Sequence, residues 1–180
     1  MNGTPIDINA ASAPGLPLES DAVLQSITSA GEGNGPVVER VSYLGFVVGV
    51  NVYGLPLDQL REVAPLKRLR RIPGAPRHVA GLMNLRGEIV CALDTRAILL
   101  LAGAPPPSGG GFLIALRGFP DPLGLVVDSI TDVYAIDPAV VESPPETWPA
   151  SRAALSLGTA TVPEGVMTLL DLRRMVEAMP

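Results

Sequence analysis

Short apolar segments separated by turn-forming residues run through most of the chain and constrain its fold more than any other feature. Segments such as 43–48, 112–117 and 123–127 are rich in β-branched and large apolar residues, and a glycine or an aspartate follows each of them. Strands at a spacing of roughly 8–12 residues with such turns are typical of β-barrels and β-sandwiches rather than of parallel sheets. The sequence therefore predicts a mainly β fold with about nine or ten short strands and about three short helices.

The most sharply defined predicted strand pair is residues 79–94, VAGLMNLRGEIVCALD. Two apolar runs flank Arg86 and Gly87, which predicts a tight hairpin. Gly87 can supply the positive φ of the turn, and Asn84 can supply a local side-chain hydrogen bond. The requirements of the turn do not explain why residue 86 is an arginine. A guanidinium on a rigid two-stranded stalk is a preorganised fork for a carboxylate or carbonyl, so we interpret the hairpin as a device that presents Arg86 to a partner.

Helices are predicted where a proline or an aspartate can begin one. Asp94 or Thr95 is expected to cap the second predicted helix, and Asp171 the third. Asp58 is likewise expected to cap one short turn before a strand at 60–64. The three predicted helices are residues 76–82, 96–103 and 172–179.

Two segments far apart in the chain share one pattern of residues. Residues 90–100, VCALDTRAILL, and residues 167–177, MTLLDLRRMVE, both read as an apolar strand, Leu-Asp and then a basic, apolar helix. Two equivalent sub-barrels, each ending in such a unit, would produce this pattern. Helix capping by the aspartates explains it equally well without any repeat, so both explanations remain open.

Residues 1–36 differ from the rest of the chain in composition and charge. They are rich in small and polar residues, and they contain four of the 18 acidic residues and no lysine or arginine, which accounts for most of the net charge of −5. The sequence predicts a disordered acidic tail over 1–36 and a single domain over 37–180. The tail could be a passive linker or a docking segment.

The expected compartment follows from the single cysteine and from the absence of export signals. Cys91 has no second cysteine to pair with, which is typical of a reducing compartment. The sequence shows no signal peptide, and its longest uncharged stretch is interrupted by prolines and glycines. We therefore expect a cytoplasmic protein without direct membrane insertion.

Catalytic, cofactor and metal sites are not expected, because the chain has one histidine, His78, and one cysteine, Cys91. Cys91 lies among apolar residues, which favours an inert buried thiol over a nucleophile. The glycine-rich stretches at 31–35 and 108–111 precede no predicted helix, so they do not predict a phosphate site. We expect no enzyme and no cofactor, and a small enzyme or ligand-binding barrel remains the alternative from another class.

One basic run, KRLRR at residues 67–71, stands out in a chain that is otherwise acidic overall. It could be a solvated loop, a contact for an acidic protein partner or a contact for nucleic acid. No aromatic residue lies beside it for base stacking, so we expect no nucleic-acid partner.

Four segments in register resemble CheW-like domains, the coupling proteins of bacterial chemotaxis. They are GLPLDQLREV (54–63), IPGAPRHVAGLMNLRGEIVCALDTR (72–96), GLVVDSITDVYAI (124–136) and GVMTLLDLRRM (165–175), and the resemblance covers about residues 40–178. It implies two small five-stranded, SH3-like β-barrels around a shared core and no enzymatic activity.

The resemblance also implies the partners and the setting of the protein. It implies an adaptor that joins the cytoplasmic tip of chemoreceptors to the regulatory domain of a histidine kinase, at receptor arrays on the inner face of the membrane. Assembly into such arrays is possible. The alternative is an adaptor of a non-flagellar pathway, such as twitching motility or second-messenger control.

Partner-binding residues are carried over position by position from this resemblance. Arg86 corresponds to the arginine implicated in partner binding, and Asn84 holds its turn. The strand after Pro-Leu-Asp is expected to contribute partner contacts, and two further residues are expected around the groove between sub-barrels that receives the receptor tip. The predicted site is Leu60, Glu62, Val63, Gly81, Asn84, Arg86 and Ile89.

Overall fold

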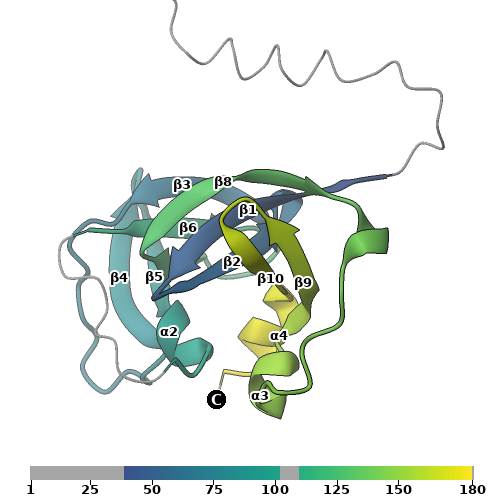
Figure 1. Cartoon of the computed structure of the whole chain (residues 1–180). Helices are drawn as coiled ribbons and strands as arrows, with labels where there is room; N and C mark the ends of the chain where they lie inside the picture. Colours follow the sequence, from purple (N-terminus) through teal and green to yellow (C-terminus); the bar gives the residue numbers. More distant parts are fainter. Residues whose placement is uncertain (1–38, 102–109, 180) are drawn as a thin grey trace, which may run out of the picture. The chain divides into compact units, whose positions relative to one another are not determined.

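Ten β-strands dominate the computed structural model of the chain, which describes residues 39–101 and 110–179 (Figure 1). The prediction of a mainly β protein with a few short helices is confirmed. The predicted disordered tail, residues 1–36, lies outside the described residues.

The strands fall into two successive runs of five, each followed by a short helix. The first run consists of β1 (Val41–Val48), β2 (Asn51–Pro56), β3 (Leu60–Pro65), β4 (Val79–Leu85) and β5 (Glu88–Asp94), followed by α2 (Thr95–Ile98). The second run consists of β6 (Phe112–Leu116), β7 (Leu123–Val127), β8 (Ser129–Ile136), β9 (Ser156–Val162) and β10 (Gly165–Leu170), followed by α4 (Leu172–Glu177). Shorter connecting elements are the 3₁₀ turns η1 (Leu57–Gln59) and η2 (Pro138–Val140) and the helix α3 (Ala150–Ala153).

The strands form two five-stranded sheets, and each sheet takes strands from both runs. The first sheet has the order β8-β1-β2-β10-β9, and the second sheet has the order β3-β6-β7-β5-β4. In each sheet two pairs join the runs: one is parallel, β2 with β10 or β5 with β7, and the other is antiparallel, as are the pairs within a run. Each run therefore gives its first two strands to one sheet and its last three to the other.

The two runs are equivalent in their order of elements and in how each final helix begins. Asp94 Oδ1 accepts hydrogen bonds from the backbone N–H groups of Arg96 and Ala97 at 3.0 and 3.3 Å. Asp171 Oδ1 accepts one from Arg174 N at 3.1 Å. These bonds satisfy backbone donors that a helix start leaves unpaired. The shared pattern of 90–100 and 167–177 thus coincides with a repeated architecture and with capping in each copy.

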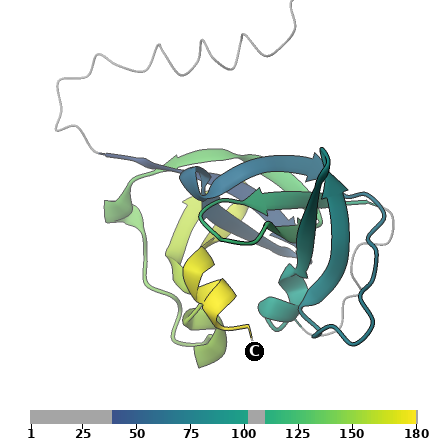
Figure 2. The same ribbon diagram turned by 180° about the vertical axis from the view of Figure 1, so that it is seen from behind.

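The largest hydrophobic cluster lies between the sheets and holds them together. It joins Phe46 and Tyr53 of the first sheet, Ile114 and Leu125 of the second sheet, and Met175 of α4, all almost completely buried. Each sheet also has a smaller cluster of its own, around Met83 in the second sheet and around Met167 in the first. Seen from both sides, α2, α3 and α4 lie together at one end of the sheets (Figures 1 and 2). Because burying a large apolar side chain stabilises a fold by about 1.5–3 kcal/mol, the shared cluster makes one folding unit of the two sheets.

Among the described residues, neither sheet is closed by direct pairing of its two edge strands. Instead, the chain that follows one edge strand pairs briefly with the opposite edge. After β3, Arg70 exchanges two backbone hydrogen bonds of 2.9 Å with Leu82 of β4. After β8, Glu142 exchanges bonds of 2.9 and 2.8 Å with Thr159 of β9. Residues 66–72 and 137–142 therefore occupy equivalent positions in the two sheets.

A glycine precedes each of these bridges and allows the crossing chain to approach. Gly81 has a φ of 147°, and a Cβ there would lie 2.7 Å from the carbonyl oxygen of Arg70. Gly158 has a φ of 152°, and a Cβ there would lie 2.5 Å from the carbonyl oxygen of Glu142. Any other residue would be both strained and in collision with backbone, so both positions require glycine.

Two predicted helices and one predicted cap were wrong in whole or in part. Residues 76–82 form turns and the start of β4, because the carbonyl of His78 accepts a hydrogen bond from Asp94 N of β5 at 2.8 Å. The predicted helix 96–103 is the single turn α2, after which Leu100 adopts a left-handed φ of 53°; residues 102–109 lie outside the described residues. Asp58 lies within η1, whose N-cap residue is a proline with no side-chain capping bond.

The bridges predict matched stability losses at the two glycines. Gly81→Ala and Gly158→Ala should each lower the free energy of unfolding by about 3 kcal/mol or more, because backbone strain and a clash with a carbonyl oxygen add together. Gly118→Ala is the control: Gly118 also has a positive φ, but no atom lies within 4 Å of its added Cβ. It should cost only about 1–2 kcal/mol, and equal losses for all three variants in denaturant unfolding would contradict the equivalence of the bridges.

Candidate functional site

A two-residue turn joins β4 to β5 and carries Arg86 at its tip. Arg86 and Gly87 have φ angles of 53° and 94°, and Asn84 Oδ1 accepts a hydrogen bond from Gly87 N at 2.9 Å. The predicted positive φ and local side-chain bond are therefore confirmed. A left-handed arginine costs about 1 kcal/mol relative to glycine, so the arginine is not at this position for the benefit of the turn.

Two ion pairs connect the hairpin tip to β3. Arg86 Nε lies 2.9 Å from Glu62 Oε2, and Arg61 Nη1 lies 2.6 Å from Glu88 Oε2. The Arg86 side chain nevertheless remains 82% exposed. Exposed ion pairs contribute about 0–1 kcal/mol, so these pairs orient the side chains more than they hold the fold together.

The predicted site residues divide into an exposed group and a buried group. Val63 is 40% exposed and Ile89 is 53% exposed, and Ile89 lies opposite the exposed Asn84 in the β4–β5 register. Leu60 and Gly81 are buried, Leu60 in the shared core and Gly81 against Arg70. We define the hairpin surface as the accessible members of the set, Glu62, Val63, Asn84, Arg86 and Ile89.

Arg61 and Glu88 were not among the predicted site residues, although they complete the charge arrangement at this surface. Arg61 and Glu62 are neighbours in β3, and Arg86 and Glu88 flank Gly87, so β3 and the hairpin each offer one acid and one base. The nearness of an acid and a base in each segment was the signal that the sequence offered for these ion pairs. It identifies which residues pair only once β3 and the hairpin are known to lie side by side.

The surroundings of Cys91 do not activate its thiol. Cys91 is partly buried in β5, and burial, together with the nearby Asp121 carboxylate, raises the pKa of its thiol. Among residues 39–101 and 110–179, no three His, Cys, Asp or Glu side chains come together in a way that could bind a metal ion. In the same residues, no helix has the length and apolar character needed to span a membrane.

Comparisons with known proteins agree on one family. The family described as "CheW-like domain" matches residues 42–179. The chemotaxis protein CheW of Treponema pallidum (strain Nichols) is 29% identical over 141 residues, which is 76% of this chain and 82% of that protein. The chemotaxis protein CheW of Helicobacter pylori is 23% identical over 153 residues, 85% of this chain and 92% of that protein.

A solved structure shows the same fold. The crystal structure of the scaffolding protein TtCheW from Thermoanaerobacter tengcongensis superposes with a TM-score of 0.65 at 23% identity and covers 80% of this chain and 91% of that one. The chain belongs to the CheW-like domain family. It is thus a chemotaxis adaptor rather than an enzyme, as the resemblance predicted, and membership implies interaction with chemoreceptors and a histidine kinase.

The division of β3 into buried and exposed positions can be tested by truncation. Leu60→Ala should lower the free energy of unfolding by about 2–5 kcal/mol, because it leaves a cavity in the shared core. Val63→Ala should change it by no more than about 0.5 kcal/mol, because Val63 is exposed. Urea unfolding measures both values, and similar losses at the two positions would contradict the placement of β3.

The raised thiol pKa predicts a slow reaction at Cys91. A higher pKa leaves less thiolate at neutral pH, and partial burial limits access, so a disulfide reagent should modify native Cys91 more slowly than an unstructured peptide thiol. Modification should reach the peptide rate in denaturant. A native rate equal to or faster than that of the peptide at neutral pH would show an activated cysteine instead.

Proposed function

We propose that this adaptor couples the cytoplasmic tip of chemoreceptors to the regulatory domain of a histidine kinase, and that its hairpin surface contacts one of these partners. The observation that carries this proposal is the left-handed, exposed Arg86 at the tip of a hairpin whose strands are fixed in the core. An arginine in that backbone conformation weakens the turn slightly, so its benefit is expected in binding.

The hairpin is suited to binding because little of it must be ordered when a partner arrives. Its turn is fixed by the Asn84–Gly87 hydrogen bond, and the side chain of Arg86 is already directed by Glu62. Preorganisation of this kind lowers the entropic cost of association. A guanidinium recognises a carboxylate through two parallel hydrogen bonds, which gives the contact direction as well as strength.

The remaining members of the predicted site take different roles in this proposal. Val63 on β3 and Ile89 on β5 provide exposed apolar contact area. Leu60 and Gly81 are positioning residues: Leu60 anchors β3 in the shared core, and Gly81 admits the crossing chain at Arg70. Substituting either of them should weaken binding only through the stability of the fold.

We further infer that each five-stranded sheet functions as a small SH3-like barrel. The backbone bridges Arg70–Leu82 and Glu142–Thr159 span the open side of each sheet, and the ion pairs between β3 and the hairpin reinforce the second one. We propose that residues 37–180 act as one domain preceded by the acidic tail of residues 1–36, and that the protein acts in the cytoplasm at receptor arrays. Repeated contacts in an array would give avidity without chemistry.

Reconstitution tests the adaptor function directly. The full chain, purified kinase and receptor cytoplasmic fragments should co-sediment, and kinase activity should depend on the adaptor. An adaptor of a twitching or second-messenger pathway would instead respond only to the kinase and receptor of that pathway. No co-sedimentation and no change in kinase activity with any such set would contradict the proposal.

Variants at Arg86 separate binding from folding. Arg86→Ala and Arg86→Asn should leave the circular dichroism spectrum and the melting temperature nearly unchanged, since the ion pair is exposed and asparagine tolerates the turn conformation. Both should weaken binding to the kinase or receptor by about tenfold, the loss expected for one charge-assisted contact.

Arg117→Ala is the matched control, because Arg117 is exposed and outside the hairpin surface. It should bind as the unmodified chain does. If Arg86→Ala melts much lower than this control, Arg86 is an internal structural group and the proposed role is wrong.

A further inference from the structure

The crossing segment of the second sheet carries a concentration of positive charge that the fold does not require. Residues 66–78 contain five lysine or arginine side chains and no acid. Four of these five, all except Arg70, line an open cavity of about 690 Å³ together with parts of β4 and β7 and one acid, Asp94 of β5. Among the described residues, none of these five cations takes part in an ion pair. The five are Lys67, Arg68, Arg70, Arg71 and Arg77.

The first sheet provides an internal comparison for this segment. Residues 137–142 make the equivalent crossing, pair with β9 at the equivalent place and contain two acids and no base. The cavity beside them is about 190 Å³ and is lined by apolar residues and Tyr43. The same crossing is therefore built without cations, so the four cations of residues 66–72 serve a purpose other than closing the sheet.

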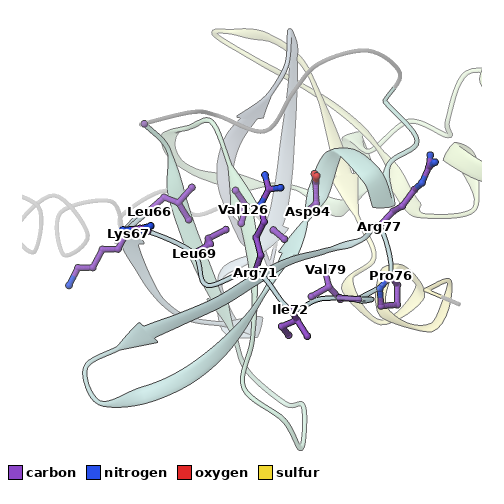
Figure 3. A pocket seen from close by; sticks show the side chains of 14 residues that line it. Leu66, Lys67, Leu69, Arg71, Ile72, Pro76, Arg77, Val79, Asp94 and Val126 are labelled. Atoms are coloured by element: carbon purple, nitrogen blue, oxygen red, sulfur yellow. The ribbon is translucent and has the colours of Figure 1, made fainter.

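The shape and chemistry of the basic cavity favour an extended ligand. Leu66, Leu69 and Val79 supply an apolar lining. Figure 3 shows Arg71 rising through the middle of the cavity, whereas Lys67 and Arg77 point away on opposite sides. Cations that diverge in this way do not converge on one small anion. They match negative charges spaced along a chain, and the apolar lining matches apolar side chains between those charges.

We propose that this cavity binds an extended acidic segment, with apolar side chains interspersed, on one of the protein partners of the adaptor. The identification of the source as a partner protein rests on the proposed function. Nucleic acid fits less well, because the cavity lining contains no tyrosine, tryptophan or phenylalanine for base stacking and the chain carries a net charge of −5. The cavity lies toward the start of β4, and Arg86 follows the end of that strand, so the two surfaces can be occupied together.

A matched pair of triple variants in the full chain tests the proposal. The cavity variant is Lys67→Gln with Arg71→Gln and Arg77→Gln. The control variant is Arg40→Gln with Arg117→Gln and Arg173→Gln, three residues that are also exposed, take part in none of the described ion pairs and lie outside the cavity lining. Both variants change the net charge by the same amount, and melting curves verify that both fold.

The probe is a fluorescent peptide of alternating glutamate and leucine, measured by anisotropy beside a single-stranded oligonucleotide and phosphatidylserine vesicles. The cavity variant should bind the peptide about tenfold more weakly than the control variant, the combined effect of three exposed charges. Peptide binding by the unmodified chain should also weaken as salt rises from roughly 50 to 200 mM.

Equal peptide affinities in the two variants would overturn the proposal. So would tighter binding of the oligonucleotide or the vesicles than of the peptide by the unmodified chain. Because the peptide is measured without kinase or receptor, failure of this assay counts against the cavity alone, whereas failure of the reconstitution counts against the proposed function.

Discussion

The hydrophobic cluster between the two sheets is the interaction on which the rest of the structure depends. Each run of five strands divides itself between the sheets, so neither run can complete a sheet without the other. The cluster then fixes the sheets to each other through residues from both, such as Phe46 and Ile114. These strand pairings and core contacts mostly join residues that are far apart in the sequence. We therefore expect the chain to fold as one cooperative unit.

That rigidity is what an adaptor needs. The hairpin surface and the basic cavity are at different places along β4, and the core prevents them from moving independently. A protein that catalyses no reaction can influence its partners only through the positions in which it holds them. The short turn at Arg86, the bridge at Arg70 and the ion pairs to β3 all restrict side chains or backbone, which lowers the entropic cost of the binding that we propose.

Local patterns in the sequence predicted local features of the fold well. The hairpin at 79–94, its turn at Arg86 and Gly87, and the caps at Asp94 and Asp171 depend on residues within a few positions of one another. The helix predicted at 76–82 does not form, because the carbonyl of His78 accepts a hydrogen bond from Asp94 N of β5. That pairing cannot be inferred from residues 76–82 alone. The division of each run of strands between the two sheets could not be predicted either, since it depends on pairings across the whole chain.

At the candidate site, too, local features could be predicted from the sequence and long-range contacts could not. Exposure of Arg86 followed from its place in a tight turn, whereas its ion pair with Glu62 required the position of β3. Gly81 was predicted as a residue near a binding groove, and its conformation and contact with Arg70 give it a role in the backbone. The proposed role of the basic run at 67–71 depends on comparison with the equivalent segment at 137–142, which the sequence alone does not align with it.

Hydrogen exchange on the full chain, alone, with the regulatory domain of its kinase and with a receptor cytoplasmic fragment, tests the central claim most directly. The claim is that the β4–β5 hairpin presents Arg86 to a partner. We predict that the amides of residues 84–89 and of β3 become protected in one of the two complexes, while those of β9 and β10 keep their rates in that complex. Unchanged exchange at residues 84–89 in both complexes would contradict the account.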